Sequence, residues 1–333
     1  MREGKRWALP LIALFAVMAL ILAACSDVES DSAASSPGGD TAVDCGDETV
    51  NIAVNPWTGS AVNANVAKVI MEQELGCTVE LTEIDEFAQF PALSTGDLDA
   101  TLEVWPSGHA KDYKTYIDGN QGVVDGGELG VIGQIGWFMP KYMTDADPSL
   151  ATVDGLAANA DLFATAETGD KGQFIGGDPS FVSYDQQIID SLKLPFKVVY
   201  AGSEAAELTA LKQAYKDESA LLLYMYKPHW AQLKYPMTQV ELPPYTDACA
   251  KAAEGDGKGY NCEYPEDVLY KAFNADLATK APAAEQFLAN MNYENEAQEA
   301  VALDIDVNGM KPAEAAQKWV DENQDVWQAW LPS

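Results

Sequence analysis

Apolar and polar positions follow two alternating patterns along residues 45–333. Short apolar runs, which are typical of buried strands, are separated by segments in which apolar positions recur at helical spacing. In the first half of the chain we expect strands at 49–54, 77–84, 98–104 and 131–139. Helices are expected between them at 61–75, with Ser60 as the N-cap, and at 87–93. This order predicts an α/β fold with parallel strands.

The pattern restarts after Pro140, so we expect a second α/β unit. Its strands are predicted at 173–176, 196–200 and 220–225, and its helices at 181–192 and 204–215. Beyond residue 265, Val268, Leu269 and Phe273 have helical spacing, which predicts a helical tail that packs on the first unit. We therefore predict two lobes with a ligand cleft between them. Lobe 1 is expected to comprise 45–140 and 236–333, and lobe 2 to comprise 141–235.

The first 24 residues have the layout of a secretory signal peptide. Basic residues at positions 2, 5 and 6 precede an apolar run from 7 to 24, and that run ends in Leu22-Ala23-Ala24-Cys25. These four residues resemble the lipobox of bacterial lipoproteins, so we expect a lipid on Cys25 and a flexible Ser/Asp/Gly-rich tether over 25–44. A transmembrane anchor is the alternative, because the apolar run reaches the lower limit of spanning length.

The chain is strongly acidic, with 20 Lys and Arg residues against 52 Asp and Glu residues and a net charge of −32. Removal of residues 1–24 takes away three basic residues and one acidic residue, so that 17 − 51 leaves a charge of −34. Such a surface repels nucleic acids and phosphate-rich ligands. We therefore expect no nucleic-acid partner.

Four cysteines remain when Cys25 is set aside: Cys45, Cys77, Cys249 and Cys262. An even number in an exported protein predicts two disulfides, and three pairings are possible. We favour Cys45–Cys77, at the starts of two neighbouring strands, and Cys249–Cys262, which closes a polar loop. A zinc site is the alternative, but the chain has no Cys-x-x-Cys pair, and His109 and His229 are far apart in sequence. No metal and no other cofactor is expected.

Aromatic residues follow or finish four of the expected strands, each close to a Pro or Gly: Trp57, Trp105, Trp137, and Tyr224 with Tyr226. One tryptophan alone is more often a core residue, but aromatics that gather at a cleft are typical of a binding site. A trimethylammonium group has no N–H to donate, and the negative faces of aromatic rings hold it with about 0.5–2 kcal/mol each. The pattern therefore predicts a quaternary-ammonium ligand.

A ligand such as glycine betaine also has a carboxylate, which needs hydrogen-bond donors. The amides of Gly59 and Ser60 lie near the start of an expected helix, where anions bind. His229 is a second candidate donor, or else a structural histidine that caps the turn after Pro228. Residues 45–333 contain no arginine, which weighs against an α-amino-acid site.

Five stretches carry a resemblance to a known family: Asn55-Pro56-Trp57, Ser94–Asp99 before Glu103-Val104-Trp105-Pro106, Gly136–Pro140, Gly202–Leu208, and Tyr226-Lys227-Pro228-His229-Trp230. In this order and spacing the chain resembles the glycine betaine/proline/choline substrate-binding proteins of ABC importers over nearly all of 45–333. The resemblance implies a type II periplasmic-binding-protein fold that closes around an aromatic box. Trp57, Trp105, Trp137 and Tyr226 match the positions that form the box.

The resemblance also implies a role: a lipid-anchored, monomeric, extracytoplasmic binding protein that delivers its ligand to an ABC permease and is not an enzyme. Members of the family often have Trp where this chain has Tyr226, and choline-selective members can have an acidic residue where it has Gly59. Tyr226 keeps a weaker π-face, and the absence of an acidic residue at Gly59 favours glycine betaine over choline. Choline, carnitine and proline betaine are the alternatives. An exported carboxylate-based hydrolase is the alternative from another class, although no Gly-x-Ser-x-Gly or His-Glu-x-x-His motif is present.

Overall fold

The computed structural model describes residues 45–333. The predicted signal peptide over 1–24, the lipidation site Cys25 and the tether over 25–44 lie outside the described residues. Within the described part, no helix is long and apolar enough to cross a membrane.

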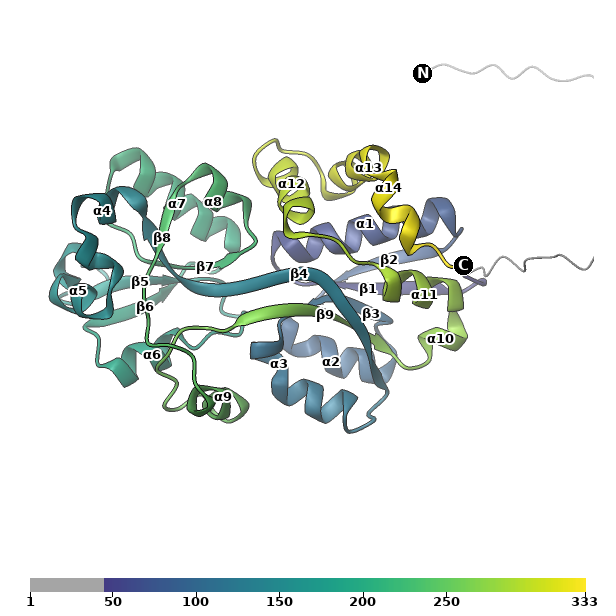
Figure 1. Ribbon diagram of the computed structural model, residues 1–333, viewed down its shortest axis with the longest axis horizontal. Coiled ribbons are helices and arrows are strands. Elements are labelled where there is room, and N and C mark those ends of the chain that lie inside the picture. Colours follow the sequence, from purple (N-terminus) through teal and green to yellow (C-terminus); the bar gives the residue numbers. More distant parts are fainter. Residues whose placement is uncertain (1–44) are drawn as a thin grey trace, which may run out of the picture. The chain divides into compact units, whose positions relative to one another are not determined.

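One mixed sheet runs through the described residues in the order β2-β1-β3-β9-β4-β7-β5-β6, and β8 pairs with β4. The strands are β1 Thr49–Val54, β2 Thr78–Glu83, β3 Ala100–Val104, β4 Val123–Pro140, β5 Gly172–Gly176, β6 Phe196–Tyr200, β7 Leu223–Lys227, β8 Met237–Gln239 and β9 Glu266–Asn274. The group β2-β1-β3 is parallel, as is the group β6-β5-β7. The antiparallel pair β4 and β9 joins the two groups (Figure 1).

Helices cover both faces of each parallel group (Figure 1). In the first lobe α1 packs with α12 and α13 on one face of the sheet, and α2 and α3 lie on the other. The helices of this lobe are α1 Thr58–Glu74, α2 Glu86–Thr95, α3 Pro106–Asp112, α10 Leu277–Lys280, α11 Pro282–Asn290, α12 Asn295–Asp306, α13 Pro312–Glu322 and α14 Gln324–Trp327.

The second lobe is built around β5, β6 and β7 (Figure 1). Its helices are α4 Lys141–Ala146, α5 Val153–Ala158, α6 Asp185–Leu192, α7 Glu204–Asp217 and α8 Trp230–Lys234. A further helix, α9 Asp247–Glu254, contacts α3. Short 3-10 or π turns occur at Tyr113–Ile117, Pro148–Ala151, Ala160–Phe163 and Gln328–Trp330. The structure confirms the predicted α/β class with two lobes.

The prediction of a helical tail from residue 265 is wrong at its start, because Glu266–Asn274 is strand β9. This strand lies between β3 and β4 in the sheet, and its last six residues are all buried. A strand with both faces covered loses the alternation of apolar and polar positions and cannot be told from a buried helix by periodicity. The residues from Leu277 onward are helical, as expected.

The predicted return of the chain to lobe 1 at residue 236 stays a prediction. In the structure β8 pairs with the end of β4, and the rings of Tyr260 and Tyr184 stack with their centroids 4.3 Å apart. The segment before β9 therefore contacts elements of the second lobe. Two disulfides are present, Cys45–Cys77 before β2 and Cys249–Cys262 after the start of α9.

Candidate functional site

Five aromatic rings line one cavity where the two lobes meet. The first lobe contributes Trp57 and Trp105, and the second contributes Phe181, Tyr224 and Tyr226. We call this the aromatic cavity. Its other lining residues are Glu86, Gly108, Ile135 and Val182, so no lysine or arginine is among them.

The sheet explains why the two tryptophans come together. Trp57 and Trp105 are the N-caps of α1 and α3, and they follow the parallel neighbours β1 and β3. The carboxyl ends of parallel neighbours lie at the same edge of a sheet, so both rings reach the cavity from one side. Gly133 on β4 leaves room for the second ring, because a Cβ at that position would overlap the Trp105 indole.

The rings meet edge to face across the lobes. Trp57 and Phe181 have centroids 5.5 Å apart with planes at 84°, and Trp105 and Tyr226 have centroids 5.6 Å apart with planes at 80°. Tyr224 lies 6.1 Å from Phe181. Both contacts at near right angles join a ring of one lobe to a ring of the other, so the cavity requires both lobes.

Trp137, which was predicted as a fourth ring of the box, does not line the aromatic cavity. It is fully buried, its ring packs on Phe174 with centroids 4.6 Å apart, and its Nε1 donates to Asp185 at 2.7 Å. Trp137 lies in β4, paired with Tyr224 of β7. It therefore lies next to a cavity residue in the sheet, while its own side chain points into the core of the second lobe.

A buried carboxylate, that of Glu103 in β3, lies behind the two tryptophans. Its Oε1 accepts Nε1–H of Trp57 at 2.7 Å and Nε1–H of Trp105 at 3.2 Å. Its Oε2 accepts side-chain N–H groups from Asn63 at 2.6 Å and Gln298 at 3.2 Å. Burial raises the pKa of Glu103 to about 7, against the effect of these hydrogen bonds. Glu103 was not predicted as a site residue from the sequence, although an acidic residue inside a fully buried strand indicates a functional or structural role.

The residues predicted to bind a ligand carboxylate have other contacts in this structure. A Cβ on Gly59 would collide with Nε2 of Gln298 and lie 3.0 Å from Oε2 of Glu103, so Gly59 allows α1 to approach the buried acid. The predicted N-cap Ser60 is wrong, because α1 begins at Thr58. The Oγ of Ser60 instead accepts the backbone N–H of Asn55 at 2.9 Å.

A carboxylate of the protein itself occupies the start of α1. Oε2 of Glu204, the first residue of α7, accepts the backbone N–H of Thr58 at 2.8 Å and its hydroxyl at 2.9 Å. Oε1 of Glu204 accepts the hydroxyl of Tyr226 and lies 3.3 Å from Nε2 of His229. Burial alone would raise its pKa, but hydrogen bonds from His229, Tyr226 and Thr58 hold the pKa of Glu204 below its usual value.

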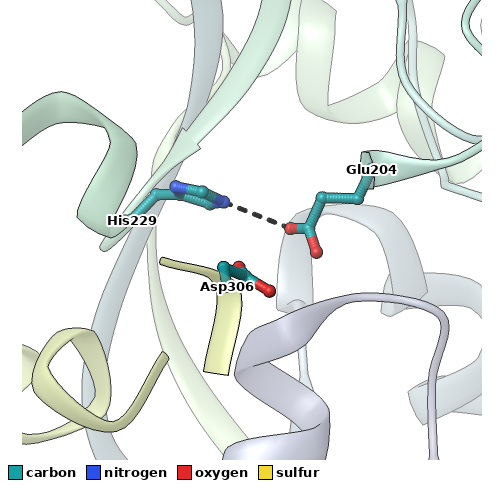
Figure 2. Close-up of side chains that lie close together, drawn as sticks. All are labelled: Glu204, His229 and Asp306. Atoms are coloured by element: carbon teal, nitrogen blue, oxygen red, sulfur yellow. Dashed lines mark ion pairs between the residues drawn. The ribbon is translucent and has the colours of Figure 1, made fainter. Parts of the chain in front are cut away.

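His229, the second candidate donor, faces this carboxylate. Figure 2 shows its ring pointing at Glu204, with Asp306 beside the pair. Asp306 in turn accepts Nε1–H of Trp230 at 2.6 Å and lies 3.0 Å from the Thr58 hydroxyl, whose single hydrogen is shared between Glu204 and Asp306. We call Thr58, Glu204, His229, Trp230 and Asp306 the interlobe network.

Glu204, His229 and Asp306 are close enough to one another to hold a metal ion. However, Nδ1 of His229 accepts the backbone N–H of Ala231 at 3.0 Å, which places the ring proton on Nε2. A protonated nitrogen is no metal ligand, and the carboxylate oxygens already accept hydrogen bonds from Thr58, Tyr226 and Trp230. The chemistry of the group is therefore that of a hydrogen-bond network.

A second carboxylate, Glu86 at the start of α2, lines the cavity directly. Its Oε1 accepts the backbone N–H of Val182 in the other lobe, and its Oε2 pairs with Nε2 of His109 at 2.9 Å. Burial would lower the pKa of His109, but its bonds to Asp112 and Glu86 raise it to about 9, so the imidazolium balances Glu86 at neutral pH.

Comparisons with known proteins agree with this architecture. Residues 48–322 match the family described as the substrate-binding domain of ABC-type glycine betaine transport systems. The trimethylamine N-oxide-binding protein of Pelagibacter ubique is 30% identical over 83% of this chain and 88% of its own length.

Solved structures show the same fold. Lactococcal OpuAC in its closed form with glycine betaine is 23% identical, covers 86% of this chain and all of its own, and gives a TM-score of 0.65. The glycine betaine/L-proline-binding protein ProX of Borrelia burgdorferi is 18% identical, covers 86% of this chain and 97% of its own, and gives 0.69. The type II periplasmic-binding-protein fold is thereby confirmed. The chain belongs to the family of substrate-binding domains of ABC-type glycine betaine transport systems, whose members bind solutes for an ABC permease and are not enzymes.

Proposed function

We propose that this protein captures a compact trimethylammonium compound in the aromatic cavity and delivers it to its permease. The observation that carries the proposal is the meeting of five aromatic rings from both lobes around one cavity with no lysine or arginine in its lining. Aromatic faces attract a cation that has no N–H donors, and two or three such contacts with burial of the methyl groups correspond to a Kd of about 1 μM.

The cage in this proposal consists of Trp57, Trp105 and Tyr226, as predicted, together with Tyr224 and Phe181. Trp137 supports the cage from the core of the second lobe and does not touch the ligand. Tyr226 replaces a tryptophan at its position and offers a weaker π-face. The edge-to-face contacts of Trp57 with Phe181 and of Trp105 with Tyr226 close the cage only when both lobes are together.

Two observations support trimethylamine N-oxide over the predicted glycine betaine in this proposal. The relative from Pelagibacter ubique is named for binding trimethylamine N-oxide. In addition, Glu204 accepts the amide of Thr58 at the start of α1, directly before the amides of Gly59 and Ser60 that were predicted to bind a betaine carboxylate. The N-oxide has a single small oxygen and needs no carboxylate site.

A titration followed by tryptophan fluorescence tests the proposal. Trimethylamine N-oxide, glycine betaine, choline and proline are each added to the full chain up to millimolar concentration. We expect trimethylamine N-oxide to bind about tenfold more tightly than glycine betaine, and proline not to bind. If none of the four changes the fluorescence, the trimethylammonium proposal is wrong. If glycine betaine binds more tightly, Glu204 moves aside for a ligand carboxylate.

We also propose that Cys25 carries the lipid that anchors the protein to the outer face of the bacterial cell membrane, where it acts as a monomer. The Leu22-Ala23-Ala24-Cys25 sequence supports this proposal. In cells that export the protein, labelled palmitate should enter the wild type and not the Cys25→Ser variant. Recovery of unlabelled wild-type protein in the soluble fraction would contradict the anchor.

A further inference from the structure

The charge of Glu103 has no cationic partner. All four of its hydrogen-bond donors are neutral N–H groups, from Trp57, Trp105, Asn63 and Gln298. Glu86 differs, because its buried partner His109 is a cation at neutral pH. A buried charge without a counter-charge is costly and is normally paired or bound to an ion.

The four N–H groups that donate to Glu103 favour its ionised form. Each carboxylate oxygen accepts two N–H groups, so a proton on either oxygen would point at a donor. Burial opposes ionisation and raises the pKa of Glu103 to about 7. A nearby positive charge would relieve this conflict, and the structure places none among the side chains that contact the carboxylate.

The missing counter-charge has a natural position on the far side of the two indoles. Both rings turn their N–H edges toward Glu103, and both line the aromatic cavity. An indole that donates to a carboxylate also gains electron density on its faces, which strengthens its attraction for a cation.

We propose that Glu103 is the counter-charge of the bound ligand: it fixes the two indoles and attracts the trimethylammonium group through them. This inference rests on the proposed function and names the residue that selects a cation over an uncharged group of the same shape. Glu103 does not touch the ligand and is therefore a positioning and specificity-determining residue.

The size of the effect follows from the width of an indole. Two opposite charges roughly 7 Å apart at an effective dielectric constant of about 20 differ from a neutral pair by a factor of about 50 in affinity. Removal of the charge alone should therefore weaken a ligand with a net positive charge, such as choline, by about 10- to 50-fold. A zwitterion should lose only about two- to fourfold, because its anionic oxygen lies further from Glu103 and partly cancels the attraction. The affinity of an uncharged ligand of the same shape should not change.

The Glu103→Gln variant removes the charge and keeps the shape. Its amide oxygen can accept the two indole N–H groups. Its NH2 group faces the amides of Gln298 and Asn63, and both have to flip to accept from it. Oε1 of Gln298 is buried without a hydrogen bond and is free to do so, whereas Oδ1 of Asn63 has to give up the hydroxyl of Tyr293. Glu80→Gln, on the exposed side of β2, is the matched control because it removes one unit of charge where solvent screens it.

The experiment compares a ligand with its carbon isostere. The pairs are choline with 3,3-dimethylbutan-1-ol and trimethylamine N-oxide with tert-butyl alcohol, and the choline pair is used where the wild type binds choline. Calorimetry on the full chain gives the ratio of the two affinities for the wild type, for Glu103→Gln and for Glu80→Gln. We expect the ratio to fall in Glu103→Gln, about 10- to 50-fold for the choline pair and about twofold for the trimethylamine N-oxide pair, and to stay unchanged in Glu80→Gln.

The wild type provides a second measurement that needs no variant. Between pH 8 and pH 6, protonation of Glu103 should weaken choline by up to about tenfold per pH unit, weaken trimethylamine N-oxide by about twofold in all, and leave the isosteres unchanged. The other ionisable groups near Glu103 are Glu204, Tyr226 and Tyr293; the pKa of Glu204 is lowered and those of the phenols are raised, so Glu204 stays ionised and both phenols stay neutral over this range. A pH dependence that remains in Glu103→Gln does not arise from Glu103 and is subtracted.

The two measurements distinguish an effect of the Glu103 charge from an effect of ring positioning. A selective loss for the cation in Glu103→Gln, with the matching pH dependence in the wild type, supports the inference. Equal losses for both ligands mean that Glu103 only positions the rings, which overturns it. If the variant does not fold, the wild-type pH dependence decides, and equal pH profiles for the two ligands overturn the inference. If the wild type binds neither cation, the proposed function fails and the inference fails with it.

Discussion

The carboxylate of Glu204 accepts the backbone N–H of Thr58 at 2.8 Å, so a side chain of one lobe caps the first helix of the other. The amides at a helix N-terminus are unpaired and carry a partial positive charge, which makes them a favourable partner for an anion. The contact is extended by Trp230, which donates to Asp306 across the lobes at 2.6 Å, and by the backbone N–H of His229, which donates to Glu299 at 3.0 Å. The lobes are thus joined by polar contacts outside the aromatic cavity.

We expect the Glu204→Ala variant to favour the open arrangement of the lobes. It loses the cap on α1 and the contact to Tyr226, so the closed state forms less readily and ligand affinity should fall about 10- to 100-fold. Small-angle scattering of the ligand-free variant should give a larger radius of gyration than the wild type. Thr209→Ala, on the exposed face of the same helix, is the control. An unchanged radius and affinity would show that the interlobe network does not stabilise closure.

Replacement of Trp137 should lower the stability of the protein, whereas replacement of Trp105 should lower its affinity for the ligand. Trp137→Ala leaves a large cavity in the core and removes one hydrogen bond to Asp185, which keeps that from Tyr264, so we expect about 3–5 kcal/mol of lost unfolding free energy. Trp105→Phe keeps a ring in the cage but removes one donor from Glu103, so it should weaken ligand binding with little loss of stability. Chemical denaturation and ligand titration of both variants measure this. Selective loss of binding in Trp137→Ala would restore it to the cage.

Gly59 should tolerate no side chain while Gln298 is in place. A Cβ there collides with Nε2 of Gln298, so Gly59→Ala should push α1 away from Glu103 and weaken ligand binding at least tenfold. The double variant Gly59→Ala/Gln298→Ala makes room and should recover part of the loss. A double-mutant cycle on ligand affinity and on thermal stability measures the coupling. Additive effects would mean that the two positions do not interact.

Thermal stability of the ligand-free protein should fall as pH rises from 5 to 9. Burial raises the pKa of Asp185 and of Asp267 to about 6 and that of Glu103 to about 7, and bonds to Asp112 and Glu86 raise the pKa of His109 to about 9 despite its burial. Groups whose pKa is higher in the folded state give stability that is fully present below the unfolded pKa. This stability is lost as pH passes the folded value.

A series of melting curves from pH 5 to 9 at constant ionic strength checks this expectation. Two groups act in the opposite direction. The pKa of Glu204 is lowered, but its contribution is lost only in acid below this range. Burial lowers the pKa of Lys271 to about 8, so its contribution rises only above pH 8 and flattens the curve between pH 8 and pH 9. A Tm that rises steadily from pH 5 to pH 9 would contradict the direction of the pKa shifts of the buried groups. A saturating ligand should reduce the slope, because its positive charge favours ionised Glu103.

Sequence patterns predicted much of this fold because local signals agreed with the tertiary structure. The strand before Trp57 and the strand before Trp105 were recognised, and their parallel pairing brings the two rings together. The interior strand β9 was misread as helix, because a strand with neighbours on both edges and helices on both faces has no polar side. The strands that pair with β9, which are β3 and β4, lie far away in sequence, and the periodicity of apolar positions within one segment does not indicate such pairing.

Only some of the site residues were predicted correctly. The position of a residue at the end of a strand indicates where its side chain begins, but not the direction in which the side chain points. Trp57, Trp105 and Tyr226 point into the cavity, whereas Trp137, in the same kind of position, points into the core. Glu204 reaches Thr58 across 146 positions of sequence, and such a contact exists only once the lobes are folded and together.

The long strand β4 has a mechanical role that follows from its contacts. Together with β9 it is the connection between the two parallel groups of the sheet, so separation of the lobes has to bend this two-stranded ribbon. The Trp105 ring lies directly against β4 at Gly133, and Ile135, two residues further along, lines the cavity. Bending of the ribbon therefore moves Ile135 and the support of the Trp105 ring when the lobes separate. A permease that separates the lobes would not have to extract the ligand from an intact cavity, because the same deformation disrupts the cavity.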